Sequence, residues 1–216
     1  MKPKLIIFDL DGTLLNTLED LADSGNYILS KYGFNQHSLD DYRYFVGNGI
    51  YKLVERILPE NKREKTFVEE VRSEFMSYYD QHKADKTAPY QGIIELLEEL
   101  QQRGIQMAIA SNKAQEAMDP LVEFYFPTVT FAAVFGQRTG IPTKPNPDIV
   151  FDILNKTNIS KSDTLYVGDT AVDMQTAKSA GVKSVGVLWG FRPKEELVQA
   201  QAELIIEKPE ELLKYC

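Results

Sequence analysis

The sequence predicts an α/β fold: a Rossmann-like parallel sheet with helices on both faces, plus an inserted all-helical domain. Two observations support this prediction. Over most of the chain, short apolar runs alternate with segments of helical periodicity, as in parallel sheets. Directly after the first apolar run, residues 17–83 show helical periodicity alone. We therefore expect a core formed by residues 1–16 and 84–216, and a helical cap domain formed by residues 17–83.

The first strand is predicted at residues 5–8, a short apolar run rich in isoleucine and phenylalanine. It is followed by Asp9 and Asp11, separated by one leucine, and then by Gly12, which allows a sharp turn. Carboxylates at positions i and i+2 of an extended segment project to the same side. They repel each other unless a cation or hydrogen-bond donors compensate. This arrangement favours a catalytic or metal site over two solvated acids in a turn.

The insertion is predicted to contain helices only. Ser38 is suited to a helix N-cap, and Gly33 and Pro59 are suited to helix ends. The polar stretch 81–87 is typical of a linker that leads back to the core. The expected helices span residues 17–32, 38–45, 50–58 and 61–82.

The remainder of the chain alternates between the two kinds of segment. Pro147, with Asn146 as N-cap, predicts the start of one helix. The expected strands are residues 106–110, 130–135, 165–167, 183–187 and 204–206, and the expected helices are residues 93–103, 115–124, 147–156, 171–180, 195–201 and 210–215.

Three more polar clusters lie near the ends of predicted strands: Ser111 with Asn112, Lys144, and Asp169 with Asp173. Ligands of parallel sheets bind beyond the carboxyl ends of the strands, so we expect these clusters to meet the first acid pair there. Each has a simpler interpretation. Ser111 and Asn112 could form a helix cap, and Lys144 could be a surface residue. Asp169 and Asp173 could be acids that favour a helix N-terminus.

Composition excludes some classes of function. The 216 residues are 43% hydrophobic and 26% charged, as in ordinary globular proteins, and the formal net charge is −8. This charge argues against non-specific nucleic-acid binding and against a basic membrane-binding surface. The single cysteine, Cys216, excludes an internal disulfide, and no apolar run has the length of a signal-peptide core or a transmembrane helix. We expect a cytoplasmic protein with no nucleic-acid or membrane partner; monomer and homodimer both remain open.

With all four clusters in chain order, the sequence resembles the haloacid dehalogenase superfamily of phosphohydrolases. The helical insertion after the first motif is similar to that of the subclass with a helical cap. Residues 45–49 and 187–193 resemble segments of phosphoglycolate phosphatases. The four motif-like segments are Asp9-Leu10-Asp11-Gly12-Thr13, Ser111-Asn112-Lys113, Lys144 within Thr143-Lys144-Pro145-Asn146-Pro147, and Gly168-Asp169-Thr170-Ala171-Val172-Asp173.

The resemblance implies a role for each acid. Asp9 would attack phosphorus and form an aspartyl-phosphate, and Asp11 would protonate the leaving oxygen and then deprotonate the attacking water. Asp9, Asp169 and the backbone carbonyl of Asp11 would hold a metal, and an all-oxygen ligand set suits Mg²⁺. Asp173 would order the waters behind the metal.

The resemblance also implies that Ser111, Asn112 and Lys144 bind the phosphate. In the cap, Arg43 and the turn Gly47-Asn48-Gly49 are candidate substrate contacts. A plain turn explains the glycines equally well, and a solvated side chain is the favoured interpretation of Arg43.

The expected activity is that of a phosphatase acting on a small phosphorylated metabolite, with 2-phosphoglycolate as the leading substrate. Alternatives within the superfamily are a pyrophosphatase, a sugar-phosphate or nucleotide phosphatase, and a phosphosugar mutase. A non-catalytic scaffold that binds a phosphorylated ligand is a further alternative. Asp11 and Asp169 argue against dehalogenase chemistry, which needs neither a general acid at that position nor a metal.

Overall fold

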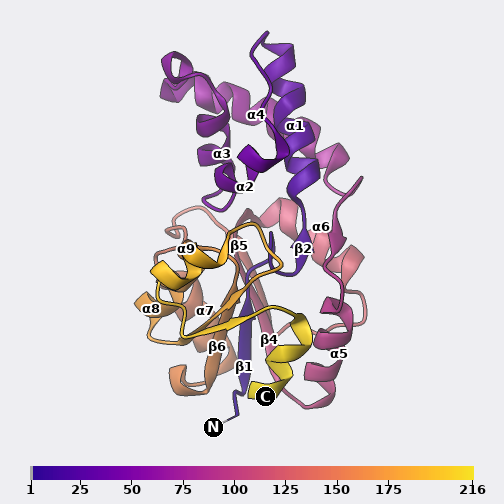
Figure 1. Ribbon diagram of the computed structural model, residues 1–216, viewed down its shortest axis with the longest axis vertical. Coiled ribbons are helices and arrows are strands. Elements are labelled where there is room, and N and C mark those ends of the chain that lie inside the picture. Colours follow the sequence, from indigo (N-terminus) through magenta and orange to yellow (C-terminus); the bar gives the residue numbers. More distant parts are fainter. Residues whose placement is uncertain (1) are drawn as a thin grey trace.

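The computed structural model describes residues 2–216 and confirms the expected fold class (Figure 1). The core is a parallel sheet in the order β5-β4-β1-β6-β7-β8. From the central strand β1, the chain adds β4 and β5 on one side and then β6, β7 and β8 on the other. This order places the carboxyl ends of β1, β4 and β6 next to one another. The strands are β1 (Leu5–Phe8), β4 (Gln106–Ala114), β5 (Ala133–Gln137), β6 (Thr164–Gly168), β7 (Lys183–Val187) and β8 (Leu204–Ile206).

Helices cover both faces of the sheet. Side chains alternate along β1, so its residues enter two different apolar clusters. Ile6 and Phe8 pack in one apolar cluster, with residues of α5, α6 and the C-terminal 3₁₀ helix. Leu5 and Ile7 pack in another, with residues of α7 and α8. The helices of the core are α5 (Ile93–Gln102), α6 (Gln115–Tyr125), α7 (Asp148–Thr157), α8 (Ala171–Ala180) and α9 (Lys194–Gln199), with 3₁₀ turns at Lys161–Asp163 and Pro209–Tyr215.

The inserted segment forms a helical layer over the end of the sheet (Figure 1). It has its own apolar cluster, which Phe191 of the core joins. Ser38 caps its helix as expected, in a reciprocal capping box with Asp41. The helices are α1 (Leu18–Lys31), α2 (Leu39–Phe45), α3 (Ile50–Ile57) and α4 (Lys65–His82), with a 3₁₀ turn at Glu60–Lys62.

The two linkers between core and cap pair with each other. β2 (Leu15–Asn16) and β3 (Ala88–Pro89) form a two-stranded antiparallel ribbon that was not expected, because two-residue strands have no detectable periodicity. Buried Asp20 accepts hydrogen bonds from the backbone of Lys86 and Thr87. The end of the polar linker is therefore fixed to the first cap helix. The division at residues 16/17 and 83/84 stays a prediction.

Some element boundaries differ from those expected. The helix expected from residue 61 begins at Lys65, after the 3₁₀ turn. The strand expected at 130–135 is Ala133–Gln137, because pairing with β4 decides its limits. The helix expected from Pro147 begins at Asp148, and the side chain of Asn146 accepts a hydrogen bond from the Asp148 amide.

Candidate active site

Three buried aspartates meet at the carboxyl ends of neighbouring strands. Asp9 follows β1, Asp169 follows β6, and Asp173 lies in the first turn of α8. One carboxylate oxygen from each lies within 4.8 Å of the others. Three carboxylates at such distances repel one another strongly in a buried site, so the cluster requires positive charge.

Lys144 supplies part of that charge. Its Nζ lies 3.0 Å from Asp9 Oδ1 and 2.8 Å from Asp173 Oδ1, and it also donates to the Ala110 carbonyl. The side chain is 1% exposed. Burial by itself lowers the pKa of Lys144, but Asp173 and Asp9 together raise that pKa well above its usual value. The lysine is therefore a charged partner of the cluster and is not a surface residue.

One lysine does not neutralise three carboxylates. Burial raises the pKa of Asp9 well above its usual value; Lys144 opposes this shift, while Asp173 and Asp169 add to it. Burial, together with Asp173, raises the pKa of Asp169 to about 7. A second cation would compensate the negative charge of these buried carboxylates, and so remove the energetic cost of ionising them.

Two loops hold Asp169 in place. Thr13 Oγ1 donates to Asp169 Oδ1 (3.0 Å), and the Phe191 amide donates to Asp169 Oδ2 (2.8 Å). A Cβ atom on Gly12 would collide with the Asp169 carboxylate, and one on Gly190 would collide with Asp169 Cβ. The segment around Gly190 therefore supports the site; the resemblance of residues 187–193 pointed to this segment, but not to its contact with Asp169.

The donor set fits a divalent cation such as Mg²⁺. Asp173 is engaged on both oxygens, by Lys144, by Tyr166 and by the Thr170 amide and hydroxyl. Asp9 and Asp169 accept fewer hydrogen bonds, and carboxylate oxygens retain lone pairs for a hard cation. The arrangement suits Asp9 and Asp169 as direct ligands, with Asp173 behind them.

Asp11 has different neighbours. Thr17, in the linker to the cap, donates to Asp11 Oδ1 (2.8 Å). Lys113 Nζ lies 3.2 Å from Asp11 Oδ1 and 3.4 Å from Asp11 Oδ2, and it donates to the Tyr79 hydroxyl of α4 (2.7 Å). The two acids that follow β1 are thus paired with different lysines. The motif-like segment includes Lys113, but sequence reasoning gave it no role.

Ser111 and Asn112 are buried at the end of β4. Ser111 Oγ accepts a hydrogen bond from the Lys113 amide. Asn112 Nδ2 donates to the carbonyls of Gly47 in the cap (3.0 Å) and Lys144 in the core (3.1 Å), and its Oδ1 accepts from the Lys144 amide. The Asn112 side chain therefore has no spare donor for a phosphate.

A small cavity lies between the acids and the cap. Its volume is about 30 Å³, and one buried water needs roughly 10–15 Å³ on the same measure. The cap side is largely apolar, and the core side contains the acids and the end of β4. The lining residues are Asp9, Asp11, Leu21, Val46, Gly47, Gly49, Ile50, Leu53, Ser111, Asn112 and Lys113.

The other candidate cap residues lie outside that lining. Asn48 Oδ1 accepts a hydrogen bond from Arg56, which orders the turn. Arg43 pairs with Asp40 on the same helix. The structure thus brings Gly47 and Gly49 to the cavity, but not the side chains of Arg43 and Asn48.

Arg192, which sequence reasoning did not single out, links the core to the cap. Its Nη2 donates to the Val46 carbonyl (3.0 Å), its guanidinium lies over the Tyr44 ring, and its Nε pairs with Glu196. The contact fixes the cap turn against the loop that supports Asp169.

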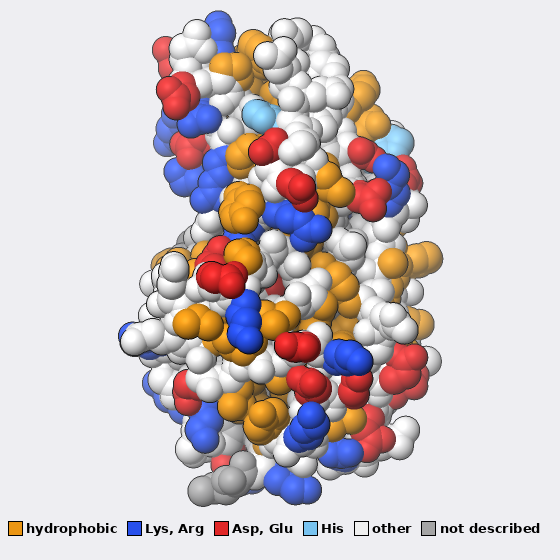
Figure 2. All heavy atoms as spheres, viewed as in Figure 1, with side chains coloured by type: hydrophobic (Ala, Val, Ile, Leu, Met, Phe, Trp, Pro, Cys, Tyr) orange, Lys and Arg blue, Asp and Glu red, His pale blue; other side chains and the backbone are white. Residues whose placement is uncertain are grey.

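Charged side chains of both signs share the surface, in keeping with the 26% of charged residues in the sequence. Figure 2 shows Lys and Arg side chains interspersed with Asp and Glu over both the core and the cap in that view. Within residues 2–216, no helix combines the length and the apolar character needed to cross a bilayer.

Comparison with known proteins places the chain in a family. A phosphoglycolate phosphatase of Pseudomonas syringae pv. tomato is 33% identical over 219 residues, covering 99% of this chain and 80% of its own length. One from Aliivibrio fischeri is 30% identical and covers 97% of this chain and 95% of its own length. A crystal structure from Lactobacillus delbrueckii subsp. bulgaricus, of a protein assigned by name as a phosphoglycolate phosphatase, matches with a TM-score of 0.93 and 32% identity. That match covers 98% of this chain and 97% of the other. The model for haloacid dehalogenase-like hydrolases matches residues 6–187, and the chain belongs to that family.

Proposed function

We propose that this hydrolase is a Mg²⁺-dependent phosphatase that acts on a small phosphorylated metabolite, and that 2-phosphoglycolate is its substrate. The main support is the contact of Asp9 with Lys144 beside Asp169, at the carboxyl ends of β1 and β6. A nucleophilic carboxylate, a fixed ammonium group and a metal-binding acid are the groups that phosphoryl transfer through an aspartyl-phosphate requires. The names of the relatives support the choice of substrate.

In the first step, a carboxylate oxygen of Asp9 attacks phosphorus, and the bond from phosphorus to the leaving oxygen breaks. The protonated carboxyl group of Asp11 gives its proton to that leaving oxygen. The products are the alcohol and an aspartyl-phosphate on Asp9. Positioning and charge stabilisation provide most of the catalysis in such a step.

In the second step, water attacks the phosphorus of the aspartyl-phosphate. The water proton moves to the ionised Asp11, and Asp9 leaves as a carboxylate. Inorganic phosphate is released, and Asp11 is again protonated for the next leaving group. A general acid or base in this position contributes roughly 10²–10⁴ in rate.

Asp9, Asp169 and the Asp11 carbonyl would hold Mg²⁺, with Asp173 ordering the metal's waters. The ion would neutralise charge on the phosphoryl oxygens. Ser111, Lys144 and the backbone amide of Asn112 would bind the phosphate, since the Asn112 side chain is already engaged.

The cavity under the cap, about 30 Å³, has room for about two waters and for no phosphomonoester. Gly47 and Gly49 bring backbone close to the cavity, and their positive φ angles suit glycine. The cap must still move to admit any phosphomonoester, and its closure would then exclude bulk water.

Phosphate release from a panel of metabolites tests this proposal. The panel contains 2-phosphoglycolate, pyrophosphate, sugar phosphates, nucleotides and ethyl phosphate, each with Mg²⁺ and with chelator. We expect Mg²⁺-dependent release that is fastest with 2-phosphoglycolate. Faster release from another compound would replace the substrate, and transfer of phosphate to a second position of a sugar would indicate a mutase. No release from any compound would favour a binding scaffold.

A further inference from the structure

Lys113 is a buried cation to which the proposed reaction assigns no role. Its side chain is 1% exposed, and burial of a charge is costly unless a partner compensates. The compensation comes from both Asp11 carboxylate oxygens and from the Tyr79 hydroxyl. These are the contacts that the structure gives to its Nζ, apart from the Tyr79 ring at 4.8 Å from that atom.

The partners of Lys113 come from opposite sides of the site. Lys113 belongs to β4 of the core, whereas Tyr79 belongs to α4 of the cap and is also buried. Thr17, which donates to the same Asp11 carboxylate, lies where the chain enters the cap. The position of the Asp11 carboxylate thus depends on a core lysine that is itself fixed by the cap.

We propose that Lys113 is a positioning residue that holds the ionised Asp11 carboxylate ready to take a proton from water, and that Tyr79 fixes Lys113 when the cap is docked. An ion pair with an ammonium group is available only to the ionised carboxylate, which is the form that acts in the second step. In that step a water oxygen bonds to phosphorus, the bond from phosphorus to Asp9 breaks, and the water proton passes to Asp11. This inference rests on the proposed roles of Asp9 and Asp11.

A direct contact with substrate is the competing role for Lys113. Within residues 2–216, it is the one lysine or arginine among the residues that line the cavity, so a substrate carboxylate could be its partner. Its three hydrogen bonds, however, go to the two Asp11 oxygens and the Tyr79 hydroxyl, whereas Lys144 makes two and retains a donor beside Asp9. The contacts therefore favour the positioning role.

The two roles affect different kinetic constants. Without Lys113, formation of the aspartyl-phosphate should continue while its hydrolysis slows. In Lys113→Met, kcat should fall about 100-fold while kcat/KM stays within about 3-fold of the wild-type value, because kcat/KM reports only steps through the first irreversible one. KM should fall together with kcat. When the reaction is quenched in acid at saturating substrate, most of the protein should carry a phosphoryl group on Asp9.

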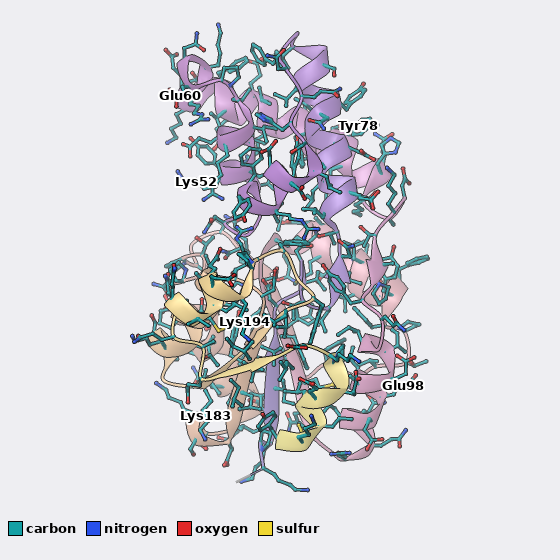
Figure 3. All side chains as sticks on the ribbon, in the orientation of Figure 1. Lys52, Glu60, Tyr78, Glu98, Lys183 and Lys194 are labelled. Carbon is teal, nitrogen blue, oxygen red and sulfur yellow. The ribbon has the colours of Figure 1, made fainter. Side chains whose placement is uncertain are left out.

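Two tyrosines of α4 provide a matched pair of variants. Tyr79→Phe removes the acceptor of the Lys113 ammonium and should give the same pattern, with kcat lowered about 10-fold. Tyr78→Phe removes the neighbouring hydroxyl, and its kinetics should be those of the wild type. Tyr78 stacks on Tyr27 and lies at the outer edge of the cap (Figure 3).

The substrate for this experiment is the phosphomonoester that the wild-type protein hydrolyses fastest. A raised KM with unchanged kcat would assign Lys113 to substrate binding, and an equal loss of kcat and kcat/KM without phosphorylated Asp9 would assign it to the first chemical step; both overturn the inference. If Lys113→Met does not fold, Tyr79→Phe decides by the same criteria. A wild-type protein that hydrolyses nothing would instead refute the proposed function, and this inference with it.

Discussion

Lys144 Nζ lies 3.0 Å from Asp9 Oδ1, and both side chains are almost fully buried. In Lys144→Met, Asp9 and Asp173 would remain buried without this cation. The phosphoryl group would also lose a fixed donor, so kcat/KM should fall by roughly 10²–10³. The free energy of unfolding should fall by about 3–5 kcal/mol. Initial rates and urea unfolding measure the two effects.

Lys183→Met is the control for that variant. Lys183 is exposed at the start of β7, away from the strand ends that bear the acids (Figure 3). Its removal should leave kcat/KM unchanged and alter stability by less than about 0.5 kcal/mol. A Lys144→Met protein with wild-type kcat/KM would show that the lysine does not act on the phosphoryl group.

The raised pKa of Asp169, about 7 against an ordinary 3.8, predicts how metal and pH act together. In chelator, the folded protein binds this proton more tightly than the unfolded chain does. The stability gained is therefore present below pH 3.8 and is lost as pH rises towards 7. Mg²⁺ favours the ionised carboxylate, so its stabilising effect should grow over the same range.

Thermal unfolding with Mg²⁺ and with chelator, at about pH 5 and about pH 8, checks this dependence. The increase in Tm that Mg²⁺ produces should be clearly larger at the higher pH. In Asp169→Asn, this increase in Tm should differ much less between the two values of pH, and the remaining difference would come from the raised pKa of Asp9. An equal increase at both values of pH would mean that Mg²⁺ does not compete with this proton.

Gly190→Ala should weaken metal binding although every proposed ligand is retained. A Cβ atom at this position would collide with Asp169 Cβ and with the Gly12 carbonyl, so the carboxylate must shift. The Mg²⁺ concentration for half-maximal activity should rise roughly 10–100-fold. Gly104→Ala is the control: a Cβ there meets nothing within 4 Å, and the strain that its positive φ puts on alanine lies between α5 and the start of β4, at the opposite end of β4 from the acids. It should leave the Mg²⁺ dependence unchanged, and an identical response of the two variants would contradict the account.

Arg192→Ala should loosen the closed cap. The variant removes the donor to the Val46 carbonyl and the contact with the Tyr44 ring. A hydrogen bond from a charged group is worth roughly 1.5–3 kcal/mol, so kcat/KM should fall roughly 10- to 100-fold, mainly through KM. Arg72→Ala removes an exposed pair with Glu69 on α4 and should have no effect. A change in kcat alone would argue against a role in closing the cap.

Much of the fold and of the acid cluster was predictable, because both depend on local pattern. Apolar runs gave β1, β6 and β7, and polar residues directly after such runs pointed to Asp9 and Asp169 at one edge of a sheet. Strand order did not have to be known, since the carboxyl ends of parallel strands share that edge.

The missing parts depend on contacts between distant residues. Lys113 and Asp11 are 102 positions apart, and Tyr79 fits a helical apolar pattern as well as any core tyrosine does. Gly190 has a role only because Asp169 packs against it. Asn112 was expected to bind phosphate, and its side chain also joins two loops whose proximity no local pattern encodes.

Asp9 is the proposed nucleophile, and phosphate release by Asp9→Asn measures that role. This variant retains the size of the side chain but removes the nucleophilic carboxylate. With Mg²⁺ and the best substrate of the wild-type protein, turnover should fall by at least about 10⁴-fold while the fold is retained. An Asp9→Asn protein that releases phosphate at the wild-type rate would show that Asp9 is not the nucleophile.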